Sequence, residues 1–146
     1  MKIGFYLKHN GTCEALESIV QEINRALSNN TIKDGLIFYE DAAKSKKYNC
    51  AMFNSCDLWS FSGKLITSSP TLFLKASNIV NNIDHYYYYG WEHVNALTLI
   101  EISNRTKIIC NSEESAEEFY RLTNKRTNKV VREYKEITGV LWLKKK

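Results

Sequence analysis

The segment Trp91-Glu92-His93 holds the most chemically suggestive residues of the chain, because it sets a carboxylate beside an imidazole. Such a pair can orient a hydroxyl group or take its proton. The segment follows the apolar, tyrosine-rich run 83–90, so we expect it at the end of a central strand. Glu92 and His93 are therefore candidate catalytic residues, although an ordinary exposed turn would also accommodate them. Trp91 is a candidate for stacking on a sugar or a base.

Two other polar turns leave apolar runs in the same way. His9, Asn10, Gly11 and Thr12 follow the run 2–7, and Asn111 and Ser112 form the polar exit of the run 106–112. Free N–H groups at the start of a helix attract anions, so the first turn is a candidate for approaching a ligand. A tight turn with a good helix cap explains it equally well. A single glycine is not the GxGxxG fingerprint of dinucleotide binding.

The cysteines argue against a metal site. Cys13, Cys50, Cys56 and Cys110 lack the paired spacing of zinc ligands, so we expect free thiols in a reducing compartment. No run reaches the roughly 18 apolar residues of a membrane helix, and no signal-peptide pattern opens the chain. The sequence is rich in Asn, Lys, Ile and Tyr, as in phages or low-GC bacteria. We therefore expect a cytoplasmic protein, in the host cytoplasm if phage-encoded, with no membrane partner.

The elements that must position these residues follow from hydrophobic periodicity. Apolar runs alternate with amphipathic stripes about every 20 to 30 residues, which is typical of βαβ units. The predicted strands are 2–7, 35–40, 50–55, 83–90, 106–112 and 128–134, whereas 56–69 reads as a loop because of Gly63 and several serines. We predict one α/β, Rossmann-like domain over 1–134, with a sheet of about five or six mostly parallel strands and helices on both faces.

This architecture predicts where the chemistry lies. Ligands of such sheets bind outside the carboxyl ends of the strands, at the switch point, so the turns 9–12, 91–93 and 111–112 should share one rim. The tyrosines of 86–89 should alternate between the two faces of the sheet and fill the core. Residues 135–146 read as a C-terminal tail that could dock on a partner chain or a second copy.

The charge is only mildly basic. The net charge of +4 permits a nucleic-acid partner without requiring one. Basic residues gather toward the C-terminus, where they form either a solvated face or a contact for DNA phosphates. These residues are Lys125, Arg126, Lys129, Arg132 and the terminal lysines.

Three segments, in this order, resemble the N-terminal Rossmann-like domain of GT-B glycosyltransferases, including phage enzymes that glucosylate DNA: KIGFYLKHNGT, YYYYGWEH and TKIICNSEESAEEFYRLTNKR. The resemblance implies that Glu92 and His93 face the acceptor hydroxyl and that the first turn approaches a sugar or phosphate. In that family a second domain holds most of the nucleotide-sugar donor. The resemblance therefore implies an acceptor-side half that acts with a separate donor-binding chain on a sugar or DNA acceptor. We expect no cofactor, apart from the nucleotide-sugar donor.

A non-enzymatic role is the alternative. The same aromatic rim would suit a phage accessory or inhibitor protein that holds a host protein or a nucleic acid. Replacing Glu92 and His93 by alanine separates the two readings, because an enzyme loses turnover whereas an interaction module depends more on Trp91 or Trp142.

Overall fold

The computed structural model describes residues 1–11, 13–43, 47–79 and 82–142. Its strands are β1 (Lys2–His9), β2 (Asp34–Asp41), β3 (Ala51–Asn54), β4 (Gly63–Thr67), β5 (Ile83–Tyr89), β6 (Lys107–Cys110) and β7 (Lys129–Val130). Its helices are α1 (Glu14–Ser28), α2 (Pro70–Ser77), α3 (Ala96–Arg105), α4 (Glu113–Thr123) and α5 (Ile137–Trp142), with the 3₁₀ turns η1 (Ser55–Ser60) and η2 (Arg132–Tyr134).

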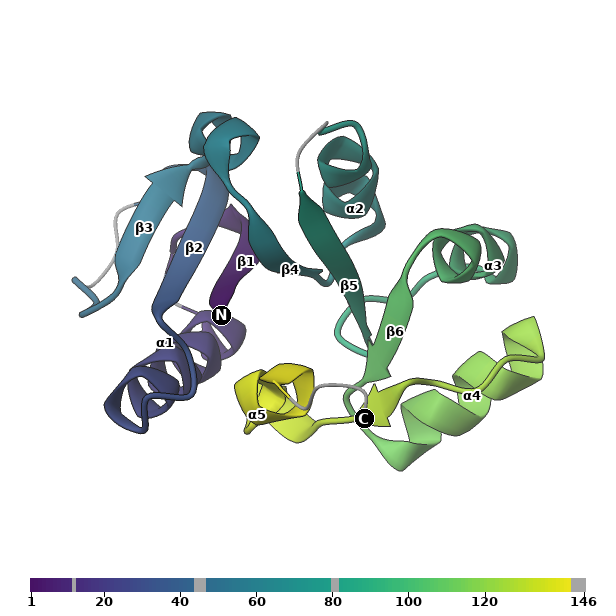
Figure 1. Cartoon of the computed structure of the whole chain (residues 1–146). Helices are drawn as coiled ribbons and strands as arrows, with labels where there is room; N and C mark the ends of the chain where they lie inside the picture. Colours follow the sequence, from purple (N-terminus) through teal and green to yellow (C-terminus); the bar gives the residue numbers. More distant parts are fainter. Residues whose placement is uncertain (12, 44–46, 80–81, 143–146) are drawn as a thin grey trace.

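The strands form one sheet in the order β3-β2-β1-β4-β5-β6-β7, and every neighbouring pair is parallel (Figure 1). The Rossmann-like α/β prediction is confirmed, and the described part of the chain has seven strands in place of five or six. The chain moves outward from β1 through β2 to β3 and then returns to place β4 on the other side of β1. The switch point of the sheet therefore lies between the carboxyl ends of β1 and β4.

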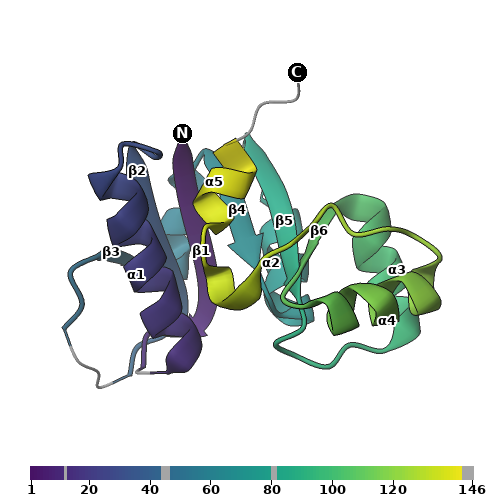
Figure 2. The same cartoon turned by 90° about the horizontal axis from the view of Figure 1, so that it is seen from below.

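Helices cover both faces, as predicted. Right-handed crossovers place α1 on one face and α2, α3 and α4 on the other, because the chain runs in opposite directions along the sheet on the two sides of β1. The connection from β2 to β3 contains no helix among its described residues. The chain's last helix, α5, returns to the face of α1 and lies beside it (Figures 1 and 2).

Local sequence explains the helix starts. Ser112 caps α4, accepting a hydrogen bond from the backbone N–H of Ser115 at 3.1 Å, and Pro70 opens α2 after Ser69, as is typical of serine and proline at helix starts. The N-cap of α1 is Cys13, whose sulfur accepts from the N–H of Leu16 at 3.4 Å.

The predicted loop over 56–69 is wrong, because Gly63–Thr67 is a central strand. β4 pairs with β1 on one side and β5 on the other. Its five residues are too few to show a period, and glycine and serines flank them. Only the pairing on both sides identifies this segment as a strand.

The predicted strand over 128–134 is shorter than expected, and residues 135–142, the described part of the predicted C-terminal tail, are packed against the domain. β7 ends at Val130, η2 follows, and α5 packs on α1 with Ile137 and Leu141 buried in the core cluster of that face. The segment 135–142 therefore belongs to the same hydrophobic core as the rest of the sheet.

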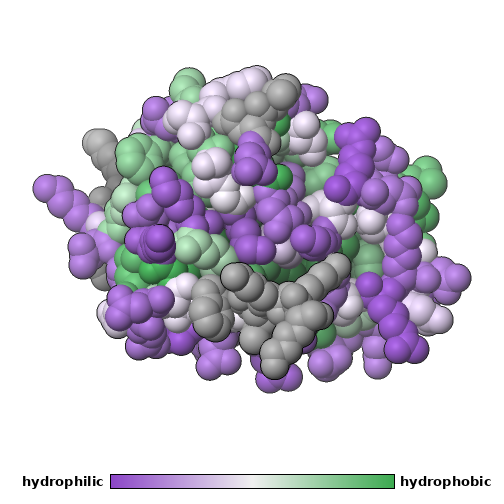
Figure 3. All heavy atoms as spheres, in the orientation of Figure 1, coloured by the Kyte–Doolittle hydropathy of each residue, from purple (hydrophilic) through white to green (hydrophobic). Residues whose placement is uncertain are grey.

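The described helices include none that is both long and apolar enough to cross a bilayer. In the view of Figure 3, hydrophilic and hydrophobic residues are interspersed over the surface.

Candidate functional site

A hollow of about 380 Å³ opens at the carboxyl edge of the sheet, at the switch point. It lies between the ends of β1 and β2, the connection from β4 into α2, and the segment that leaves β5. Its lining residues are Leu7, Lys8, Glu40, Ser68, Ser69, Thr71, Leu72, Lys75 and Glu92. Carboxylates, ammonium groups and hydroxyls thus converge on one small space with a partly apolar wall, which is the usual character of a small-molecule site.

Glu40, near the end of β2, is fixed on one side of this hollow. Its carboxylate accepts hydrogen bonds from the ammonium of Lys75 at 2.5 Å and from the hydroxyl of Tyr6. The bond from Lys75, followed by that from Tyr6, lowers the pKa of Glu40. Burial and the Glu40 carboxylate raise the pKa of Tyr6. Glu40 is therefore an ionised, oriented acceptor at neutral pH.

Other groups around the hollow have hydrogen-bonding capacity that the described residues do not use. Ser69 makes no side-chain cap hydrogen bond, although it stands at the N-cap of α2. Lys8 and Glu92 are exposed and form no ion pair with the described residues. The first backbone N–H groups of a helix also lack partners within it. Donors and acceptors are mixed here, which suits a ligand bearing several hydroxyl groups.

Gly90 turns the chain from β5 toward the hollow. Its φ is +122°, and a Cβ placed on it would meet the side-chain oxygen of Asn111 at 2.1 Å. Only glycine fits this conformation and this space. The turn brings Glu92 to the hollow. His93 is exposed and makes no hydrogen bond or ion pair with the residues that the structure describes.

Trp91 lies against a ring stack. Its ring is stacked on that of Tyr134 with centroids 6.0 Å apart, and Tyr134 is stacked in turn on Tyr88 at 4.2 Å. Trp91 is 37% exposed, and the rest of its surface is covered by other residues of the chain, Tyr134 among them.

His9, the last residue of β1, and Asn10 after it form hydrogen bonds near the ends of β1 and β2. The Nδ1 atom of His9 accepts from the N–H of Gly11 at 3.1 Å, and the side-chain oxygen of Asn10 accepts from the N–H of Ala43 at 2.7 Å. Thr12 lies outside the described residues. The structure does not bring His9, Asn10 or Gly11 into the lining of the hollow.

Asn111 and Ser112, the third predicted group, serve the start of α4. Ser112 is its cap, and the side-chain oxygen of Asn111 accepts from the hydroxyl of Ser115 at 2.7 Å. Neither residue lines the hollow. Their predicted contact with a ligand stays a prediction.

The four tyrosines of β5 are core residues, as predicted. Tyr86 and Tyr88 face α1 and α5, whereas Tyr87 and Tyr89 face α2, α3 and α4. All four are buried, and each hydroxyl has a hydrogen-bond partner. This run therefore forms no exposed stacking platform.

Sequence reasoning missed most of the lining. Glu40 ends an apolar strand and could have been found as an acid at a carboxyl edge. Ser68 and Ser69 were hidden because β4 was not recognised. Lys75 looks like any exposed residue of a short helix, and only the tertiary structure shows its contact with Glu40.

A strained segment forms the back of the switch point on the α1 side. Glu133, Tyr134 and Glu136 all have positive φ values, of 46°, 60° and 61°. Such backbone costs on the order of 1–3 kcal/mol per residue and persists where packing over-determines it. Here the packing centres on Tyr134, which is 1% exposed. Its ring packs edge-on against that of Phe5, with the ring centroids 5.8 Å apart.

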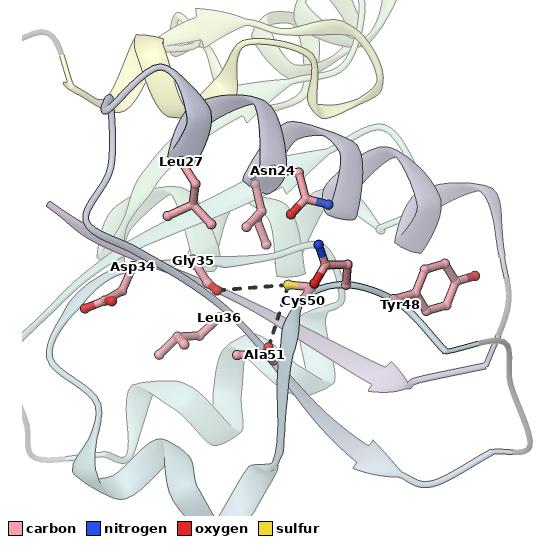
Figure 4. A pocket seen from close by; sticks show the side chains of 10 residues that line it. Asn24, Leu27, Asp34, Gly35, Leu36, Tyr48, Cys50 and Ala51 are labelled. Atoms are coloured by element: carbon pink, nitrogen blue, oxygen red, sulfur yellow. Dashed lines mark hydrogen bonds between the residues drawn. The ribbon is translucent and has the colours of Figure 1, made fainter.

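A second hollow, of about 470 Å³, lies between the C-terminal half of α1 and the beginnings of β2 and β3 (Figure 4). The thiol of Cys50 contacts the carbonyl oxygens of Gly35 and Ala51 there, and burial raises its pKa to about 11. A thiol with this pKa is protonated at neutral pH and is a poor nucleophile. The ring of Tyr48 points away from Cys50 (Figure 4). This hollow lies at the beginnings of β2 and β3, far from the carboxyl edge of the sheet.

Within the described part of the chain, no three His, Cys, Asp or Glu side chains are grouped to hold a metal ion. Comparison with protein-family models, with curated proteins and with solved structures finds no match to this chain.

Proposed function

We propose that the chain binds a hydroxyl-rich small molecule, a sugar or a nucleoside, in the switch-point hollow and is the acceptor-side half of a GT-B-like sugar-transfer enzyme. One observation carries the proposal: Glu92, which the sequence singled out as a catalytic candidate, lines the same hollow as Glu40, Ser69 and Lys8. Mixed donors and acceptors on a partly apolar wall match a ring that carries several hydroxyls.

In this proposal each group has a distinct role. Glu92 accepts the hydrogen of the reacting hydroxyl, since it has no ion pair among the described residues and its carboxylate is available. Glu40, held by Lys75 and Tyr6, orients a second hydroxyl. Trp91 and His93 flank Glu92 in the chain but do not line the hollow. The nucleotide-sugar donor is held by a separate chain, which is the partner that the GT-B resemblance implies.

The test has a binding arm and a turnover arm. Monosaccharides and nucleosides are titrated against the wild-type chain and against Glu92→Gln, with Glu101→Gln as the matched control on an exposed helical site. We expect Glu92→Gln to weaken binding about tenfold, which corresponds to about 1.4 kcal/mol, without changing the melting temperature. Turnover is measured with UDP- and GDP-sugars, alone and with the product of a neighbouring reading frame. Absence of both binding and turnover would remove the enzymatic proposal.

A non-enzymatic binding protein is the second candidate, favoured by exposed apolar residues near the same edge. Trp91 is partly exposed, and Leu97, in the first turn of α3, is 81% exposed. In this reading the partner is a host protein or a nucleic acid, and Trp91→Ala weakens binding whereas Glu92→Ala does not. The predicted contact of 135–146 with a partner chain or a second copy, and the predicted cytoplasmic setting, stay predictions.

A further inference from the structure

The switch point of this sheet has two sides, and Tyr134 occupies one of them. The hollow described above lies on the side of α2. On the side of α1, η2 packs against α1, and the Tyr134 ring lies 5.8 Å from Phe5 of β1 with its hydroxyl bonded to Ser68 at the end of β4. Tyr134 thus contacts the residue after β4 and the strand β1, and the turn η2 that carries it packs against α1, the helix that follows β1.

This is the place that a Rossmann-like sheet offers to phosphate groups. A pyrophosphate normally lies between the end of the first strand and the start of its helix, where backbone N–H groups are free. Cys13, the N-cap of α1, packs against the core cluster that contains Tyr134. The first turn of α1 also carries Glu14 and Glu17, whose charges oppose an anion.

Contacts with Tyr88 hold Tyr134 in this position, although its backbone has a positive φ. It stacks on Tyr88 at 4.2 Å, and its N–H donates to the Tyr88 hydroxyl at 3.2 Å. Tyr134 itself and Glu133 before it have positive φ values, as does Glu136, whereas Lys135 is extended. A conformation that is unfavourable for each residue alone is therefore kept so that a tyrosine ring fills the α1 side of the switch point.

We infer that Tyr134 is a specificity-determining residue that excludes phosphate groups from the start of α1, so that ligands enter only the hollow beside α2. The inference rests on the proposed function for the choice of that hollow as the acceptor site. It narrows the substrate class to an uncharged, hydroxyl-bearing ring and assigns the diphosphate of a nucleotide-sugar to another chain.

The experiment measures gain of anion binding. Inorganic pyrophosphate and UDP are titrated calorimetrically against the wild type, Tyr134→Gly and Glu133→Gly. Glycine relieves positive φ at either position, but only Tyr134→Gly removes the ring. We expect no pyrophosphate binding by the wild type or by Glu133→Gly. For both probes we expect the affinity of Tyr134→Gly to exceed that of the wild type by about tenfold or more.

Two results would overturn the inference: pyrophosphate binding by the wild type, or a folded Tyr134→Gly chain with no gain. Tyr134→Asn serves if the glycine variant does not fold, because asparagine tolerates positive φ. Pyrophosphate binding by the wild type would overturn the inference even if neither variant folds. Since pyrophosphate carries no sugar, this outcome is independent of whether sugars bind in the hollow beside α2, and the two proposals can fail separately.

Discussion

The buried carboxylate of Glu22 in α1 joins the two ends of the chain by accepting hydrogen bonds from Thr138 at the start of α5. The backbone N–H of Thr138 donates at 3.1 Å and its hydroxyl at 2.5 Å. Arg25 donates to the same carboxylate at 2.8 Å. Although burial opposes it, these bonds lower the pKa of Glu22. The carboxylate also satisfies a free N–H of α5, whose positive end favours an anion.

Glu22→Ala should therefore weaken the packing of α5 on α1. It leaves the buried N–H and hydroxyl of Thr138 without partners, so we expect a loss of about 2–4 kcal/mol in the free energy of unfolding. Urea denaturation measures it. Glu101→Ala, which breaks an exposed pair with Arg105, is the control and should cost less than about 0.5 kcal/mol. Equal effects of the two variants would contradict the anchoring role of Glu22.

His85 should make stability depend on pH. It is half-buried, its ring stacks on Phe73 with centroids 4.7 Å apart, and its Nε2 lies 3.0 Å from the hydroxyl of Thr67. Burial lowers the pKa of His85 to about 4. Because this folded-state pKa is lower than the ordinary value of about 6.5, the unfolded chain binds the proton more readily, and stability falls as the pH drops below about 6.5.

The full shift corresponds to about 3 kcal/mol, at about 1.4 kcal/mol per pKa unit. His85→Gln keeps a polar partner for Thr67 but does not titrate. Unfolding free energies of both chains are measured from pH 7 to pH 5, above the range where carboxylates titrate. We expect the wild type to lose stability across this interval and His85→Gln to lose much less. Parallel curves would show that His85 does not titrate as its burial requires.

Gly90 and Gly139 should respond in opposite directions to alanine. Gly90→Ala sets a Cβ against Asn111 at positive φ, so we expect a loss of about 2 kcal/mol or more and displacement of Glu92. Gly139 lies within α5, and a Cβ there meets nothing within 4 Å. Gly139→Ala should therefore stabilise the chain by about 0.5–1 kcal/mol. Thermal unfolding of the two variants provides the comparison, and a neutral Gly90→Ala would refute the steric argument.

Ser69 and Ser112 form a second matched pair. Both stand at helix N-caps, but only the Ser112 hydroxyl accepts a backbone hydrogen bond. Ser112→Ala should cost about 1 kcal/mol of stability. Ser69→Ala should leave stability nearly unchanged and weaken sugar binding, since Ser69 lines the hollow and its side chain makes no cap hydrogen bond. Melting temperatures and titrations of both variants test this, and the reverse assignment of effects would exclude Ser69 from the site.

Much of the fold could be predicted because it depends on residues that are close together in the sequence. The apolar stripe of α1, the proline at the start of α2 and the serine cap of α4 each act within a few residues. The alternating faces of Tyr86–Tyr89 follow from the geometry of any strand. Gly90 and Glu92 were also placed correctly at the carboxyl edge, because a strand exit is a local feature.

The site itself could be predicted only in part, because its groups come from different crossovers. Glu40 meets Lys75 and Tyr6 through three separate elements, and no sequence spacing encodes that contact. Ser68 and Ser69 reach the hollow only because β4 inserts between β1 and β5.

The sequence by itself determined the strand and helix rhythm, the caps, the two faces of β5 and the exit at Gly90, since each depends on neighbouring residues. Only the tertiary structure decided that Gly63–Thr67 is a central strand, that α5 returns to lie on α1, and that Tyr134 fills one side of the switch point. The physical reason is that these features rest on burial and hydrogen bonds between residues far apart in the chain. Glu22 and Thr138, 116 residues apart, are the clearest case.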